Sequence, residues 1–228
     1  MRSPGVPATA MPSAEAIADT FLRSLGQAVA GTYPFRHWLL TRMLPPSSCA
    51  AVDALDVAPP PIGDTLGKRE THNSSRLFFG VRQRAAHAVC NDIAHAFQGR
   101  GVVRRLEQTC GVCLSGSSLR IEYCLDTDGF WLEPHTDIGA KLFTMLIYLS
   151  EDPGSEAWGT DLYDADRTWV GTTPYARNAG LIFIPGPDTW HGVERRPIKG
   201  VRRSLIVNYV KPEWRSRHEL AFPEQAVE

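Results

Sequence analysis

The second half of the chain is a series of short apolar segments, and this pattern constrains the fold more than any other feature. Stretches of four to eight residues, suited to strands, alternate with turns rich in Gly, Pro, Asp and Asn. Such a series is typical of jelly rolls and β-barrels. The predicted strands are residues 119–125, 142–149, 160–163, 181–184, 190–193 and 204–210.

Helical periodicity is found mainly in the first half. Ser13 can cap the first helix, in which Ile17, Phe21 and Leu25 recur at helical spacing. The predicted helices are residues 13–30, 45–55, 83–98 and 102–109, and residues 34–44 look extended. Helices therefore precede strands. This order predicts a mainly β fold with N-terminal helices, an α+β arrangement in which a jelly roll is braced on one side.

The length of 228 residues suits one well-filled domain. We expect residues 1–12, rich in Pro and Ala, to form a loose tail without the apolar segment of a secretory signal. Residues 13–228 are then a single domain: helical support and a substrate loop (13–117), the jelly-roll core (118–211) and a C-terminal tail (212–228). Residues 57–79 are polar and interrupted by Pro and Gly, which is typical of a functional loop or lid.

Composition excludes several classes of function. The formal net charge is −1. The sequence lacks the basic stripe with interleaved aromatics that is typical of nucleic-acid binding, so it gives no indication of that function. The apolar runs are strand-sized, too short to cross a membrane. The five cysteines, an odd number, do not suggest a disulfide framework, and Cys110-Gly-Val-Cys113 lacks the further ligands of a zinc site. We expect a cytoplasmic protein with reduced thiols, monomeric or homodimeric.

Candidate metal ligands lie in the strand-rich half. His135 and Asp137 are two residues apart, so an extended chain places both side chains on one face. His191 follows much later, in Trp-His-Gly-Val. Two imidazoles and one carboxylate are a ligand set for Fe(II) that leaves coordination positions open. His135, Asp137 and His191 are therefore the predicted metal ligands and catalytic centre.

A cation follows on the next predicted strand. Arg202 lies eleven residues after His191 and belongs to Val-Arg-Arg-Ser-Leu-Ile-Val-Asn-Tyr-Val. Alternation puts Arg202 and Ser204 on one face of that strand and Arg203 on the other. Both faces carry apolar residues, so alternation alone does not identify the inner face. We prefer Arg202 inside the barrel, where a guanidinium can hold a carboxylate through two parallel hydrogen bonds.

This combination of motifs resembles that of the Fe(II)- and 2-oxoglutarate-dependent oxygenases. The order His135-Thr-Asp137, His191, Arg202-x-Ser204 carries the resemblance, which covers roughly residues 118–211, and the last strand is similar to that of the prolyl-hydroxylase-like bacterial branch. The resemblance implies a double-stranded β-helix. It also implies Fe(II), 2-oxoglutarate and O2 as metal, cosubstrate and oxidant.

The resemblance assigns further roles by position. Arg202 and Ser204 resemble the clamp for the distal carboxylate of the cosubstrate, and Tyr148 resembles a tyrosine that bonds the same carboxylate. Tyr123 resembles an inward-facing pocket tyrosine, and Thr144 shares a face with Tyr148. Related halogenases lack the carboxylate ligand. The presence of Asp137 therefore favours hydroxylation over halogenation. Desaturation, epimerisation and ring formation use the same ligand set and stay open as alternatives.

The substrate is left open by the sequence. Candidate contacts are Arg69 and Arg76 in the irregular segment, Trp131 before the metal strand, and Trp158 beyond it. We expect a dioxygenase that hydroxylates an unactivated C–H bond of a small molecule, such as an amino acid, a peptide-like compound or a biosynthetic intermediate. The alternatives are a cupin-like metal enzyme that needs no 2-oxoglutarate, a hydroxylase of peptidyl proline, and a barrel that binds without turnover.

Overall fold

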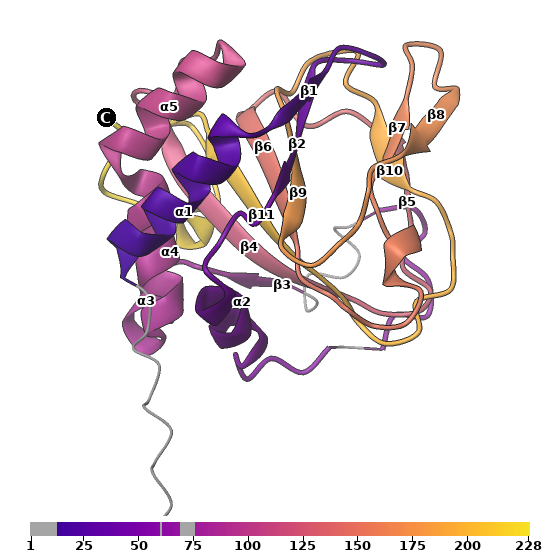
Figure 1. Cartoon of the computed structure of the whole chain (residues 1–228), viewed down its shortest axis with the longest axis horizontal. Coiled ribbons are helices and arrows are strands. Elements are labelled where there is room, and N and C mark those ends of the chain that lie inside the picture. The colour runs from indigo at the N-terminus through magenta and orange to yellow at the C-terminus, as the bar shows by residue number, and fades with distance from the viewer. Residues whose placement is uncertain (1–12, 60, 69–75) are drawn as a thin grey trace, which may run out of the picture.

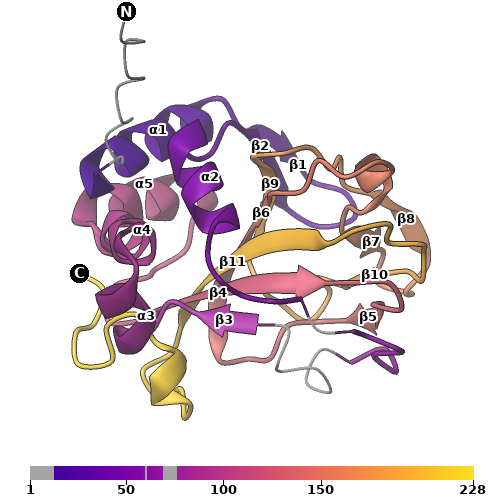
Figure 2. The ribbon, with the colours of Figure 1, turned by 90° about the horizontal axis from the view of Figure 1, so that it is seen from below.

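The structure is a computed structural model, and it describes residues 13–59, 61–68 and 76–228. Three layers lie side by side: helices, a large sheet and a small sheet (Figures 1 and 2). Both sheets are antiparallel. The large sheet has the order β1-β2-β9-β6-β11-β4-β3, and the small sheet has the order β5-β10-β7-β8. This arrangement agrees with the predicted jelly roll.

Seven of the strands in the described residues fall in segments that the sequence pattern predicts to be extended. Four further strands were not predicted. The strands of the large sheet are β1 Val29–Gly31, β2 His37–Thr41, β9 Ala179–Phe183, β6 Lys141–Tyr148, β11 Arg202–Val210, β4 Ser118–Asp126 and β3 Arg76–Phe78. Those of the small sheet are β5 Leu132–His135, β10 His191–Val193, β7 Asp161–Tyr163 and β8 Trp169–Thr172. The unpredicted strands, β1, β3, β5 and β8, have only three or four residues each, too few to show alternation.

The helical layer consists of α1 Ala14–Gly26, α2 Pro46–Asp53, α3 Val81–Ala86, α4 Ala88–Gln98 and α5 Arg100–Cys110. Ser13 caps α1 as predicted, because its hydroxyl accepts a hydrogen bond from the Ala16 N–H. The single helix predicted over residues 83–98 is wrong. His87 adopts extended backbone angles and divides it into α3 and α4.

Two apolar cores lie on opposite faces of the large sheet. On β11, Leu205, Val207 and Tyr209 face the helices and join the larger core. Ile206 faces the small sheet and joins the smaller core. Strand alternation therefore puts Arg202, Ser204 and Asn208 on the inner face, between the two sheets. We call the space between the two sheets the barrel interior. Side chains on the inner face of the large sheet point into it.

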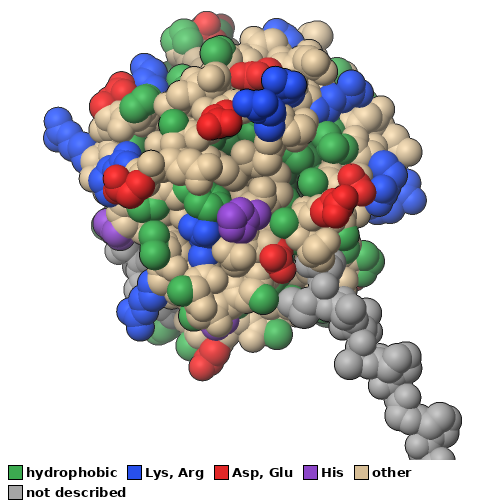
Figure 3. Space-filling model, turned by 90° about the vertical axis from the view of Figure 1, so that its left-hand side faces the viewer, with side chains coloured by type: hydrophobic (Ala, Val, Ile, Leu, Met, Phe, Trp, Pro, Cys, Tyr) green, Lys and Arg blue, Asp and Glu red, His purple; other side chains and the backbone are tan. Residues whose placement is uncertain are grey.

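The C-terminal segment, expected to be a tail, is packed against the large sheet. Ala221 donates its N–H to the Leu119 carbonyl, and Val227 donates to Ser117. Ala221 and Val227 belong to the larger core. No described helix has the length and apolar character needed to cross a membrane. On the face made by the helices, acidic and basic side chains are intermixed (Figure 3).

Candidate metal centre

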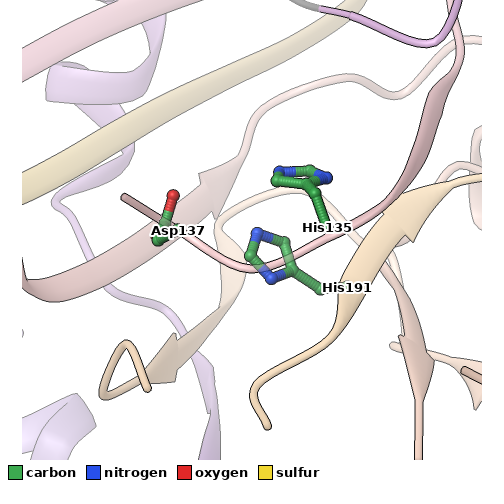
Figure 4. A group of neighbouring side chains, drawn as sticks. All are labelled: His135, Asp137 and His191. Carbon is green, nitrogen blue, oxygen red and sulfur yellow. The ribbon is translucent and has the colours of Figure 1, made fainter. Parts of the chain in front are cut away.

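The three predicted ligands come together between the sheets. His135 ends β5, Asp137 lies in the turn that follows, and His191 begins β10. One ligand atom from each lies within 4.8 Å of the others, and the two imidazole centroids are 4.4 Å apart. The side chains converge from one strand end and its neighbour (Figure 4). This grouping is the one set of potential metal ligands found among the described residues.

An irregularity in β5 aims His135 at His191. His191 pairs with His135 and Val193 pairs with Leu132, so a spacing of two residues on β10 matches three on β5. In a regular strand, residues three apart face opposite ways, and His135 would point away from the core that Leu132 contacts. The extra residue of the bulge turns it inward. Pro134 lies in this bulge, where a residue without an N–H is tolerated.

Backbone carbonyls fix the tautomer of both imidazoles. His135 Nδ1 lies 2.8 Å from the Glu133 carbonyl oxygen, and His191 Nδ1 lies 2.9 Å from that of Thr189. A carbonyl oxygen only accepts, so each Nδ1 carries the hydrogen and each Nε2 offers a lone pair. Burial, together with the neighbouring His135, lowers the pKa of His191 to about 4. His191 is therefore neutral at pH 7, the form that binds a metal.

Asp137 is held in its ionised form by its neighbours. Lys141 donates from Nζ to Oδ1 at 2.5 Å, and Thr144 donates its hydroxyl hydrogen to Oδ2 at 2.6 Å. Burial raises the pKa of this carboxyl, but the charge of Lys141 and the hydrogen bonds from Lys141 and Thr144 outweigh it and lower the pKa to about 2. Thr144 in turn accepts from the Asn208 amide at 3.0 Å. Thr144, expected in the cosubstrate pocket, contacts the metal ligand instead.

Arg202 lies inside the barrel, on the face that the sequence favoured. Its side chain is 1% exposed; Nη1 donates to Asp126 Oδ2 at 2.7 Å, and Nε donates to the Trp158 carbonyl at 2.8 Å. Nη2 makes no hydrogen bond to any residue that the structure describes, so it can donate to another acceptor. Arg203 projects to the other face and lies 3.5 Å from Asp152, where both side chains are about one third exposed.

Ser204 is the second polar side chain on that part of the inner face. It is fully buried and pairs across the sheet with Cys124 and Tyr148. Its hydroxyl makes no hydrogen bond within the described part of the chain. A buried hydroxyl without a partner is costly, by about 1–3 kcal/mol, so this atom points to a bound acceptor.

The two tyrosines behave differently. Tyr148 is buried inside the barrel, stacked on Tyr175 with ring centroids 4.5 Å apart, and its hydroxyl lies 2.9 Å from those of Thr160 and Thr173. Among the described residues, the Tyr148 hydroxyl therefore bonds these two threonines and not Arg202. The placement of Tyr123 in the pocket is wrong. Tyr123 belongs to the core between sheet and helices, and burial there raises its pKa.

The substrate candidates are scattered. Arg76 on β3 forms an ion pair with Glu122 at 3.0 Å. Trp131 donates from its indole to Asp64 at 2.7 Å, beside β5. Trp158 is 1% exposed and belongs to the smaller core inside the barrel, and its contact with substrate stays a prediction. Arg69 lies outside the described residues.

Sequence reasoning missed the residues that support the site. Lys141 donates to Asp137, and Asn208 donates to Thr144. Asp126 pairs with Arg202. Lys141, four residues after Asp137, was the one that spacing could have suggested. Two surface hollows lie elsewhere. One, of about 730 Å³, lies between α1 and α5, and the other, of about 420 Å³, is lined by Trp131 and neighbours; no triad residue lines either.

No protein-family model matches the sequence, and no curated protein is similar to it in sequence. Solved structures share its fold. A prolyl-4-hydroxylase from Pseudomonas putida aligns with a TM-score of 0.53 and 14% identity, over 90% of this chain and 99% of that one. A prolyl 4-hydroxylase from Phytophthora capsici aligns with a TM-score of 0.56 and 12% identity, over 91% and 69%.

A third structure is similar to the same extent. The prolyl hydroxylase of Trichoplax adhaerens, solved with a peptide fragment of the hypoxia inducible factor, aligns with a TM-score of 0.55 and 14% identity, over 87% of this chain and 90% of that one. At sequence identities this low, the structural similarity shows that the fold is shared and shows nothing more. The predicted jelly-roll core with N-terminal helices is thereby confirmed.

Proposed function

We propose that this chain is an Fe(II)- and 2-oxoglutarate-dependent dioxygenase that hydroxylates an unactivated C–H bond of a small molecule. The observation that carries the proposal is the meeting of His135, Asp137 and His191 between the sheets of a jelly roll. The fold shared with solved prolyl hydroxylases supports it. Hydroxylation, and a small molecule as substrate, rest on the ligand set and on the sequence resemblance.

The ligand set fits Fe(II). Two imidazole Nε2 atoms and one carboxylate take one face of a metal ion and leave other positions for exogenous ligands. Bound Fe(II) would supply the activation of O2 that C–H hydroxylation needs. The chain itself holds the ligands in place: backbone carbonyls fix both imidazoles, and Lys141 and Thr144 fix the carboxylate. Such outer contacts orient ligands and strengthen metal binding.

The barrel interior also fits an acidic cosubstrate. Arg202 Nη2 and the unpartnered Ser204 hydroxyl project from the same strand face, two residues apart. Both are donors, and a distal carboxylate is the acceptor that satisfies a guanidinium and a hydroxyl together. We assign Arg202 and Ser204 to that carboxylate. Tyr148 lines the same interior with its hydroxyl already engaged by two threonines.

Two other functions have some support. The pairing of Arg202 with Asp126 favours a metal enzyme that uses no 2-oxo acid, because the cation already has a carboxylate partner. The solved structures of similar fold are prolyl hydroxylases, which keeps peptidyl proline as a substrate class. Both alternatives retain the metal centre and differ in what binds beside it.

Oxygen-dependent turnover of 2-oxoglutarate tests the proposal. The protein with Fe(II) and 2-oxoglutarate should release succinate in air, and amino acids or peptides that fit the site should raise the rate. His135→Ala should abolish the release. His87→Ala, which removes a histidine from the junction of α3 and α4, is the matched control and should keep it. Succinate release that survives His135→Ala would contradict the assignment of the triad.

A further inference from the structure

Arg202 already has a carboxylate partner from its own chain. Asp126 and Arg202 are directly opposite each other on β4 and β11, and Nη1 lies 2.7 Å from Asp126 Oδ2. Neither side chain is more than 1% exposed. The Phe130 ring lies 5.7 Å from the guanidinium carbon. The Arg202 guanidinium therefore has a buried carboxylate partner before any cosubstrate enters.

The ion pair between Arg202 and Asp126 changes the electrostatic surroundings that a dicarboxylate meets when it enters the barrel. A distal carboxylate that binds Arg202 Nη2 would share one guanidinium with Asp126, and two buried carboxylates in such proximity repel each other. A 2-oxo acid with an uncharged distal end would meet the same two donors, Arg202 Nη2 and Ser204 Oγ, without that repulsion. The ion pair therefore reduces the advantage that a free arginine would give to a charged tail.

We infer that Asp126 is a specificity-determining residue that lets the site accept 2-oxo acids with an uncharged, hydrogen-bond-accepting tail nearly as well as 2-oxoglutarate. This inference rests on the proposed function, because it concerns the cosubstrate of that site. Asp126 acts through Arg202 and through its own charge. It is distinct from the triad, whose metal would bind the other end of the 2-oxo acid.

Anaerobic titration of the Fe(II)-loaded full chain tests the inference. The probes are 2-oxoglutarate and its 5-methyl ester, which keeps the acceptor atoms of the tail and loses its charge. The visible band of the iron–2-oxo acid chelate reports binding without turnover. In the unmodified protein, the two dissociation constants should differ by less than about tenfold, because the guanidinium already pairs with the Asp126 carboxylate.

Asp126→Asn removes the charge and keeps an oxygen that accepts from Nη1. It should tighten binding of 2-oxoglutarate by about tenfold and leave the ester within about twofold, because only the repulsion between carboxylates is lost. Asp152→Asn is the matched control. Asp152 pairs with Arg203 on the opposite face of the same sheet, at 3.5 Å and partly in solvent. This variant should change neither constant.

Two results would overturn the inference while the proposed function stands: a more than hundredfold preference of the unmodified protein for 2-oxoglutarate, or weaker or unchanged binding in Asp126→Asn. The first comparison needs no variant, so it decides the matter even if Asp126→Asn fails to fold. If neither probe gives the band with Fe(II)-loaded protein, before or after the substitution, the proposed function and the inference both fall.

Discussion

Gly192 lies directly against the bulge of β5, and a Cβ atom on it would be 2.8 Å from the carbonyl oxygen of Leu132. The carbonyl oxygen of Glu133 would be 3.2 Å away. Gly192 follows His191 on β10, and Leu132 and Glu133 precede His135 on β5. The absence of a side chain at one position thus permits the strand geometry that brings the two metal-binding histidines together.

Gly192→Ala should weaken metal binding. The atoms in the way are backbone carbonyls, which cannot move aside as the end of a flexible side chain does, so β5 must shift and carry His135 with it. We expect affinity for Fe(II), or for Co(II) as a spectroscopic substitute, to fall by roughly tenfold or more, as for other changes beside metal ligands. Metal titration followed by absorption measures this effect.

Gly171→Ala is the matched control. Gly171 lies on β8 of the same sheet, and no atom lies within 4 Å of a Cβ added there. This substitution should leave metal affinity unchanged. Equal losses in the two variants would mean that general damage to the small sheet, and not the approach of Gly192 to the bulge, causes the effect.

Thr144→Val should loosen the carboxylate ligand while it keeps the shape of the side chain. It removes the hydrogen bond to Asp137 and leaves the Asn208 amide without that acceptor. We expect metal affinity to fall by about 10- to 100-fold and the free energy of unfolding to fall by about 1–3 kcal/mol. Thr172→Val breaks a similar threonine–aspartate bond, to Asp161, and should leave metal affinity unchanged.

Acid should destabilise the protein through Glu122. Burial raises the pKa of this carboxyl, but the charges of Arg120 and Arg76 outweigh burial and lower it from an ordinary 4.5 to about 2. A carboxyl whose pKa is lower in the folded state stabilises the fold at pH values above its unfolded pKa. That contribution, roughly 3 kcal/mol, is lost as the pH falls from about 4.5 to 2.

Denaturant unfolding at several pH values measures this linkage. Between pH 5 and 2.5, the loss of stability should be smaller in Glu122→Gln than in the unmodified protein, because glutamine does not titrate. The variant should also be less stable at pH 7, where Arg120 and Arg76 no longer pair with an ionised carboxylate at this position. Parallel pH profiles for the two proteins would show that Glu122 does not have a lowered pKa.

The two adjacent arginines should differ in their effect on stability and on ligand binding. Arg202→Ala removes a buried guanidinium that pairs with the Asp126 carboxylate and should cost about 3–5 kcal/mol of unfolding free energy. Arg203→Ala breaks a partly exposed pair and should cost about 1 kcal/mol or less. Arg202→Ala should also weaken binding of 2-oxoglutarate, whereas Arg203→Ala should not. Calorimetry and ligand titration report these effects, and the reverse order would show that the faces of β11 are misassigned.

The sequence was sufficient to predict the triad because its order and spacing carry chemistry. His135 and His191 are the only two histidines between residues 118 and 211, and a spacing of two places His135 and Asp137 on one face. The fold class followed from helices that precede short strands. These predictions depend on patterns that are local, or on ligand chemistry that few folds accommodate.

Other features depend on tertiary packing that no local pattern contains. All nine residues of β4 are buried, so alternation could not show that Tyr123 faces the helices while Asp126 faces Arg202. Trp158 looked like a loop residue, but it fills the space between the sheets. The bulge that turns His135 inward appears only when β5 is paired with β10. In each case the partner strand decides where the side chain points.

The most direct test of the central claim is the anaerobic addition of Fe(II) and 2-oxoglutarate to the full chain, followed by visible absorption. We expect a charge-transfer band of the chelate that saturates at one iron per chain and is lost in Asp137→Ala and His191→Ala. A folded protein that binds Fe(II) through this triad but gives no band with 2-oxoglutarate would contradict the claim that the barrel binds this cosubstrate.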